Sequence, residues 1–155
     1  MSRYRSQVRE VINRNTVVSL ALDQGFNAFL PVYDGGVDFI LYRESDGLVR
    51  KVQLKGRWTI ERKYLDRDIW VAFPIAGDWH VMPHDEMVAL AEAEGVTKTV
   101  SWMKGGAYSK PRPSKGECQE FRVRAGIMGK KEPRNVPTQR ACDTERSAGS
   151  AAGWR

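Results

Sequence analysis

Two short segments decide the fold of this chain: Gly35-Gly36-Val37-Asp38-Phe39-Ile40-Leu41-Tyr42 and, after a turn, Val52-Gln53-Leu54-Lys55-Gly56. Apolar residues alternate in both segments, and Ser45-Asp46-Gly47 between them is typical of a turn. The pattern therefore predicts two paired strands. Because side chains alternate between the faces of a strand, Gln53 and Lys55 share one face of the sheet.

The length of the turn sets which residues of the two strands lie opposite each other. A two-residue turn at Asp46-Gly47 pairs Asp38 with Lys55 and places Gln53 diagonally beside Asp38. A four-residue turn keeps the three side chains on one face, whereas a three-residue turn sends Asp38 to the other face. Since apolar residues surround Asp38 in its segment, we expect this strand to be buried on both faces.

A carboxylate, an amide and an ammonium thus converge on one face of the predicted sheet. Two interpretations are open. Asp38 and Lys55 form a salt bridge with no further role, in which case replacing Lys55 by methionine is tolerated or stabilising. Alternatively the three residues form a functional site, because burial of charged groups is unfavourable without a specific partner.

These residues resemble the motif of the PD-(D/E)XK nuclease superfamily. In that motif an Asp begins one strand, and an Asp, Glu or Gln on the next strand precedes a Lys by two positions. Asp38, Gln53 and Lys55 match it, and the resemblance spans about residues 8 to 95. It implies a restriction-endonuclease-like α/β core, with a central mixed sheet of about four to five strands flanked by helices. Two departures are that Gln53 replaces the usual acidic residue and that no proline precedes Asp38.

The resemblance also implies metal-dependent hydrolysis of phosphodiester bonds, with DNA as the substrate and Mg²⁺ or Mn²⁺ as the cofactor. Asp38, Gln53 and the backbone carbonyl of Leu54 would be the metal ligands, an all-oxygen set that suits a hard cation. Lys55 would orient the attacking water and offset charge that develops on the phosphate. Only one of these expected ligands is a carboxylate, which favours weaker metal binding. The alternative is therefore a catalytically inactive module of the same fold that binds nucleic acid or a protein partner.

An N-terminal helix is predicted before the first strand. Apolar residues recur at helical spacing, and Gly25 follows as a terminator; the stripe consists of Val8, Val11, Ile12, Val18 and Leu22. Asn15 lies on this stripe, and a buried polar residue needs a partner. Because many members of the superfamily carry a site residue on their first helix, we consider Asn15 an additional site residue. A structural hydrogen bond is the alternative.

Basic and aromatic residues alternate directly after Lys55, in Arg57-Trp58-Thr59-Ile60-Glu61-Arg62-Lys63-Tyr64. We predict that Arg57, Arg62 and Lys63 contact the phosphates that flank the scissile bond, and that Trp58 or Tyr64 stacks on a base. A hairpin with a solvated face is the alternative. Further strands are predicted at 26 to 32, 69 to 74 and 79 to 82, the last two joined through Gly77-Asp78, and a helix at 85 to 94 that ends at Gly95.

Charge divides the chain into two parts. Residues 1 to 105 hold 14 basic and 14 acidic residues, whereas residues 106 to 155 hold 11 and 5. We therefore predict a nuclease-like domain over 1 to 105 and a disordered basic tail over 106 to 155, with a short strand at 121 to 125 as an alternative within it. Cys118 and Cys142 in this tail have no zinc-site spacing.

The sequence lacks a long apolar run and a signal-peptide pattern at its start. We therefore expect a cytoplasmic protein that does not associate with membranes. A homodimer would present two sites to the two strands of a duplex, but the sequence has no clear interface signature. The oligomeric state is therefore left open at this point.

Overall fold

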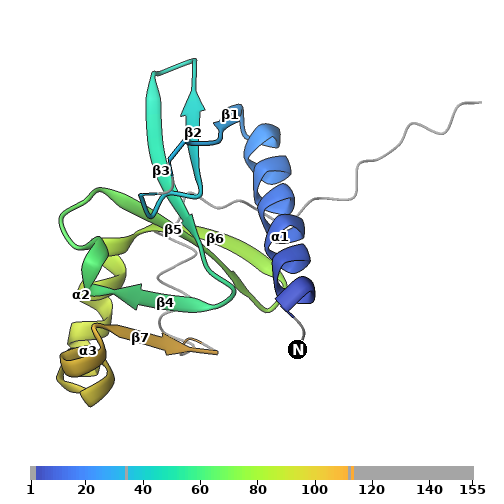
Figure 1. The fold of residues 1–155 in the computed structure, drawn as a ribbon. Helices are drawn as coiled ribbons and strands as arrows, with labels where there is room; N and C mark the ends of the chain where they lie inside the picture. The colour runs from blue at the N-terminus through green and yellow to red at the C-terminus, as the bar shows by residue number, and fades with distance from the viewer. Residues whose placement is uncertain (1–2, 34, 112, 114–155) are drawn as a thin grey trace, which may run out of the picture.

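The computed structural model describes residues 3 to 33, 35 to 111 and 113 (Figure 1). The chain begins with α1 (Arg3–Asp23), β1 (Phe26–Phe29), β2 (Phe39–Arg43) and β3 (Leu48–Leu54). It continues through β4 (Trp58–Glu61), the 3-10 turn η1 (Arg62–Tyr64), β5 (Ile69–Ile75) and β6 (Asp78–Pro83). The last elements are α2 (His84–Ala93), the 3-10 turn η2 (Val96–Lys98), α3 (Val100–Gly105) and β7 (Ala107–Lys110).

Five strands form a mixed sheet in the order β1-β2-β3-β5-β6. β3 and β5 are parallel, and the other neighbouring pairs are antiparallel. Parallel neighbours need a crossover connection, which β4 and η1 supply here. The predicted fold class, an α/β core with a mixed sheet of about five strands flanked by helices, is confirmed.

The β2–β3 connection is a four-residue turn, because Arg43 pairs with Leu48 and Phe39 with Val52. Of the turn lengths considered, the four-residue turn is therefore present, and Gln53 rather than Lys55 lies opposite Asp38. Arg43 stabilises the longer turn through two bonds to the Asp46 carboxylate, at 3.0 and 2.5 Å. The difference of two residues preserves the alternation of faces, so Asp38, Gln53 and Lys55 still share one face.

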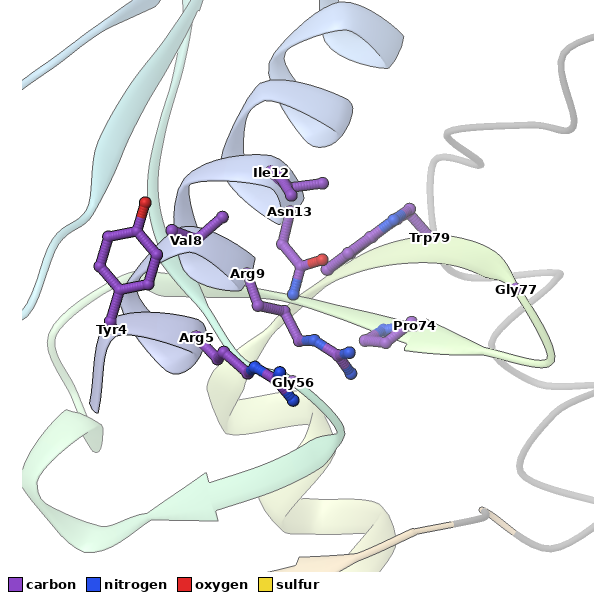
Figure 2. A pocket seen from close by; sticks show the side chains of 10 residues that line it. All are labelled: Tyr4, Arg5, Val8, Arg9, Ile12, Asn13, Gly56, Pro74, Gly77 and Trp79. Atoms are coloured by element: carbon purple, nitrogen blue, oxygen red, sulfur yellow. The ribbon is translucent and has the colours of Figure 1, made fainter. Parts of the chain in front are cut away.

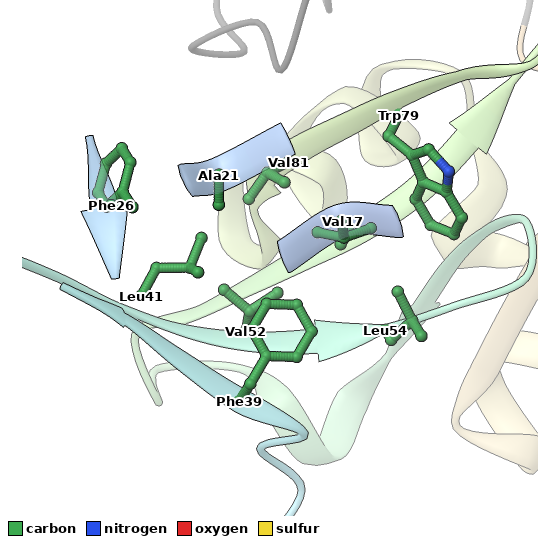
Figure 3. Packing of buried hydrophobic residues seen from close by; sticks show 10 residues of the cluster. Val17, Ala21, Phe26, Phe39, Leu41, Val52, Leu54, Trp79 and Val81 are labelled. Carbon is green, nitrogen blue, oxygen red and sulfur yellow. The ribbon is translucent and has the colours of Figure 1, made fainter. Parts of the chain in front are cut away.

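α1 packs on the opposite face of the sheet through the second half of its length. Val17 and Ala21, one helical turn apart, are fully buried against Phe39, Leu41 and Val52 (Figure 3). The predicted stripe is wrong, because Val8, Val11, Ile12 and Leu22 are exposed and only Val18 packs at the edge of this cluster. The register of the helix against the sheet, and not apolar character alone, selects its buried face.

Burial of β2 is one-sided. Phe39 and Leu41 are fully buried under α1, whereas Ile40 and Tyr42 on the other face are only partly covered. The expected burial on both faces is therefore wrong for this strand. Asp38 itself is partly exposed, so a ligand can reach its carboxylate from solvent.

The other face of the sheet carries a second core. Residues of β5 and β6 pack there against β4, α2 and α3, in a cluster that consists of Trp58, Ile60, Val71, Phe73, Met82, Met87, Ala91, Val96 and Trp102. β7 pairs with β4 in an antiparallel two-stranded sheet, with Ile60 opposite Tyr108. The ordered fold therefore continues to Lys110, beyond the domain boundary predicted at 105.

Element boundaries differ from the predictions by a few residues. β1 ends at Phe29 rather than 32, shortly before Pro31 removes a backbone donor. The β5–β6 turn is Ala76-Gly77, with φ values of +51° and +92° that match a tight two-residue hairpin turn. The tail from 114 onward, with Cys118, Cys142 and the segment 121 to 125, lies outside the described residues. Within the described ranges, no helix is long and apolar enough to span a membrane.

Candidate active site

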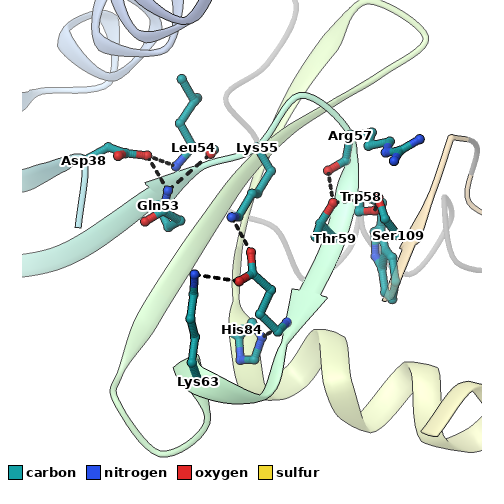
Figure 4. Close-up of polar contacts among 11 residues, drawn as sticks. Asp38, Gln53, Leu54, Lys55, Arg57, Trp58, Thr59, Lys63, His84 and Ser109 are labelled. Carbon is teal, nitrogen blue, oxygen red and sulfur yellow. Dashed lines mark hydrogen bonds and ion pairs between the residues drawn. The ribbon is translucent and has the colours of Figure 1, made fainter. Parts of the chain in front are cut away.

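Asp38 stands directly before β2 and is joined to β3 by its backbone and its side chain. Its backbone N–H donates to the Val52 carbonyl at 2.9 Å. Its Oδ2 accepts hydrogen bonds from Nε2 of Gln53 at 2.7 Å and from the backbone N–H of Leu54 at 2.6 Å (Figure 4). The position of the carboxylate is therefore fixed by two donors of the neighbouring strand.

The Gln53 amide lies between two oxygen atoms. The same Nε2 that donates to Asp38 also lies 3.4 Å from the backbone carbonyl oxygen of Leu54. An amide group has a donor end and an acceptor end. A half-turn of the Gln53 amide would place its oxygen in the present position of Nε2, beside the carboxylate and the carbonyl. These atoms are the three that the sequence predicted as metal ligands.

A small divalent cation fits this set of donors. Mg²⁺ prefers oxygen ligands, keeps several waters, and is commonly held by one or two carboxylates together with substrate phosphates. In the structure, the Gln53 amide nitrogen offers its partial positive charge to the Asp38 carboxylate and the Leu54 carbonyl. A bound cation would offer a full positive charge to the same two oxygen atoms. Asp38 contributes the one formal negative charge of this set.

Lys55 follows β3 and forms an ion pair with Oε1 of Glu61 (Figure 4). Its Nζ also lies 5.4 Å from the centre of the Tyr64 ring. The side chain keeps only 20% of its surface exposed. The register therefore places Asp38 with Gln53, while the ammonium of Lys55 is held by β4 at the border of the same face.

Glu61 also belongs to this cluster, although it was not predicted as a site residue from the sequence. Its second carboxylate oxygen pairs with Nζ of Lys63 at 2.7 Å. Burial alone would raise the pKa of Glu61, but hydrogen bonds from Lys55 and Lys63 outweigh it and lower the pKa. The alternation of buried Trp58 and Ile60 in β4 was the available signal, since it places Glu61 on the other face.

His84, the first residue of α2, is completely buried behind Glu61. Its Nε2 accepts a hydrogen bond from the Glu61 backbone N–H at 3.1 Å, which requires an unprotonated Nε2. The ring meets Tyr64 edge to face, with centres 5.6 Å apart. Burial lowers the pKa of His84, although the neighbouring Asp85 works in the opposite direction.

The lowered pKa of His84 predicts a pH dependence of stability. As the pH falls below the ordinary value of 6.5, the unfolded chain binds a proton before the folded one. The stabilisation is therefore complete above this value and is lost as the pH falls toward the folded pKa. We expect the free energy of unfolding, from urea denaturation between about pH 7.5 and pH 5, to fall more steeply for the wild type than for His84→Gln. Equal slopes would contradict the assignment.

The segment after Lys55 differs in part from the predicted nucleic-acid interface. Arg57 is exposed, and Lys63 is exposed apart from its pair with Glu61. Arg62 donates to the Met103 carbonyl at 2.7 Å and so joins η1 to α3. Trp58 is fully buried in the second core, and Tyr64 is almost fully buried. Stacking of Trp58 or Tyr64 on a base is therefore wrong, because both rings serve packing.

A tight contact supports the loop before Asp38. Gly36 has a φ of +87°, and a Cβ at this position would lie 3.0 Å from Cε1 of Tyr64. Arg67 donates to the neighbouring Gly35 carbonyl at 2.7 Å. The loop is thus held against η1 by a glycine that tolerates both the positive φ and the close approach.

We expect Gly36→Ala to destabilise the fold by more than the roughly 1–2 kcal/mol of left-handed backbone strain. Gly47→Ala is the matched control, because Gly47 has a φ of +70° and a Cβ there meets nothing within 4 Å. The difference between the two variants in free energy of unfolding, from urea denaturation, measures the cost of placing a Cβ against Tyr64. Equal destabilisation would show that the contact is unimportant.

Asn15 does not approach Asp38. Its side chain is exposed and lies at a shallow depression with Ile12, Thr16 and Ser19. The expectation that Asn15 lies on the buried face is wrong, because the face defined by Val17 and Ala21 points elsewhere. Asn13 lies one helical turn before Val17 and is half-buried. It lines a hollow together with Gly56.

The chain was compared with protein families, with curated proteins and with solved structures. No family model and no curated protein matches the chain. Among solved structures, the chain is similar to the bacterial homing endonuclease I-Ssp6803I, at 16% sequence identity and a TM-score of 0.42. The superposition covers 67% of this chain and 73% of that one. The likeness is one of fold.

Proposed function

We propose that this protein is a metal-dependent nuclease that hydrolyses phosphodiester bonds of DNA, as the resemblance to the PD-(D/E)XK superfamily implies. One observation carries the proposal: the Asp38 carboxylate and the Leu54 carbonyl converge on the amide of Gln53. Three potential oxygen ligands of different residues at one point suit a divalent cation. Asp38 and Gln53 are partly exposed, which leaves the site open to a polymeric substrate.

Asp38, Gln53 and the Leu54 carbonyl would hold Mg²⁺ or Mn²⁺. Such an ion polarises a phosphoryl oxygen and lowers the pKa of a bound water. The Leu54 N–H and the strand pairing would hold the carboxylate in place. Lys55 would move its ammonium from Glu61 toward the phosphate and stabilise the charge that develops there. Arg57 and Lys63 would contact flanking phosphates, which positions the strand without reading its sequence.

A cleavage assay tests the proposal. Purified protein is incubated with supercoiled and with linear DNA in Mg²⁺, in Mn²⁺ and in excess chelator. We expect nicked or shortened products with either metal and none with chelator. Absence of products at millimolar metal, or equal cleavage in chelator, would contradict metal-dependent hydrolysis.

A second candidate is a catalytically inactive module that binds nucleic acid. The observation that favours it is that Oδ2 of Asp38 already accepts two hydrogen bonds from within the protein. This candidate predicts salt-sensitive DNA binding that neither requires Mg²⁺ nor yields product. The same cleavage assay, combined with a binding measurement in chelator, separates the two.

A further inference from the structure

A hollow of about 720 Å³ lies between the first half of α1 and the β5–β6 hairpin (Figure 2). Pro74 and Trp79 of the hairpin form one side, and Asn13 lies at the helix side. Figure 2 shows the side chains of Arg5 and Arg9 extending from successive turns of α1 toward Gly56 and Pro74. We call this feature the α1 groove.

The charged residues that line the α1 groove are basic. Arg5 and Arg9 line it, and none of the described residues that line it is acidic. α1 also has no acidic residue in its first turn. The amino end of a helix carries the positive end of its dipole, where basic side chains are unfavourable for the helix itself. Of the two arginines, only Arg5 lies in this first turn, so the helix dipole disfavours Arg5 alone. The two guanidinium groups together match an anionic partner.

The α1 groove adjoins the candidate active site along the chain. Gly56 lines the groove and directly follows Lys55, and the exposed Arg57 comes next. α1 covers the face of the sheet opposite Asp38 and Gln53, so a duplex bound at the site would reach the groove around the end of β3, past Gly56. This arrangement resembles the line of phosphate contacts that fixes a nucleic acid in register.

We infer that the α1 groove binds the DNA backbone beside the scissile bond, through contacts of Arg5 and Arg9 with phosphates. This inference rests on the proposed function, because it takes the same substrate. Arginine forks suit phosphate oxygens, and the apolar surface of Pro74 and Trp79 suits the sugar faces between them. The groove widens the footprint of the protein on DNA and does not itself take part in hydrolysis.

The test is DNA binding by full-length protein as a function of salt. A fluorescent duplex is titrated in chelator, which prevents cleavage, with the wild type, Arg5→Ala, Arg9→Ala and the double variant. Each lost phosphate contact lowers the slope of log K against log salt by about 0.9, so the double variant loses about twice that. Arg14→Ala is the matched control, because Arg14 lies on the same helix and does not line the groove.

The outcomes separate this inference from the proposed function. A reduced slope in the groove variants, with an unchanged slope in Arg14→Ala and unchanged thermal unfolding, supports the inference. If every variant cleaves DNA and binds it with the wild-type salt slope, the role of the groove is overturned and the proposed function is not. A change of mass in light scattering for the groove variants, with unaltered DNA binding, would assign the groove to a second copy of the chain. Absence of any DNA binding by the wild type would overturn both.

Discussion

Replacement of Asp38 by alanine is expected to abolish metal-dependent cleavage, with a loss of at least about 10³-fold in rate. The carboxylate is the one formal negative charge among the three proposed ligands, and metal catalysis supplies several kcal/mol, at about 1.4 kcal/mol for each factor of ten. The rate of nicking of supercoiled DNA at saturating Mg²⁺ measures the loss. Cleavage retained by Asp38→Ala would remove the assignment.

Asp38 also has a structural role that the experiment must separate from chemistry. Alanine leaves the Leu54 N–H without its present acceptor, which costs about 1–3 kcal/mol when such a group is buried. Asp38→Asn keeps an oxygen acceptor for this N–H while it removes the charge. We expect Asp38→Asn to unfold at nearly the wild-type temperature and still to lack cleavage. Glu92→Ala is the control for loss of a carboxylate, since Glu92 is exposed on α2 and takes no part in the site or in the β2–β3 turn.

The variant Lys55→Met is expected to lower the cleavage rate by about 10²- to 10³-fold, the usual effect of removing one group that stabilises transition-state charge. Its stability should change by less than about 1 kcal/mol. Glu61 keeps its pair with Lys63 at 2.7 Å, so its carboxylate is not left unpaired, which is the main cost of removing one partner from a buried ion pair. Single-turnover cleavage and urea denaturation measure the two effects.

Lys63→Met is the matched control for Lys55→Met. It removes the other ammonium that contacts Glu61, and the exposed Lys63 is expected only to contact flanking phosphates. Lys63→Met should therefore weaken DNA binding and leave the rate at saturating DNA nearly unchanged. A wild-type rate in Lys55→Met would show that the Lys55–Glu61 pair is structural.

The strands that carry the site could be predicted because their signals are local. Alternation of apolar residues located β2 and β3, and it placed Asp38, Gln53 and Lys55 on one face whether the turn has two residues or four. The pairing partner of Asp38 could not be predicted, because Arg43 and Asp46 select the longer turn through a contact between side chains. The sequence thus defined the common face and not the register.

Contacts between segments far apart in the chain could not be predicted from the sequence. β4 reads as an isolated basic and aromatic segment, but its pairing with β7 about 50 residues later buries Trp58 and presents Glu61 to Lys55. In α1, Val8 and Ile12 show the same apolar spacing as a buried face. The helix packs instead through Val17 and Ala21, whose side chains are small enough to permit a close approach to the sheet.

Calorimetric titration measures directly whether Asp38 and Gln53 hold a divalent cation. Mg²⁺ and Mn²⁺ are titrated into the wild type and into Asp38→Asn, without DNA. We expect the wild type to bind one ion, at millimolar or lower concentration, and the variant to lose this binding. No binding by the wild type, or equal binding by both proteins, would contradict a metal site at Asp38 and Gln53.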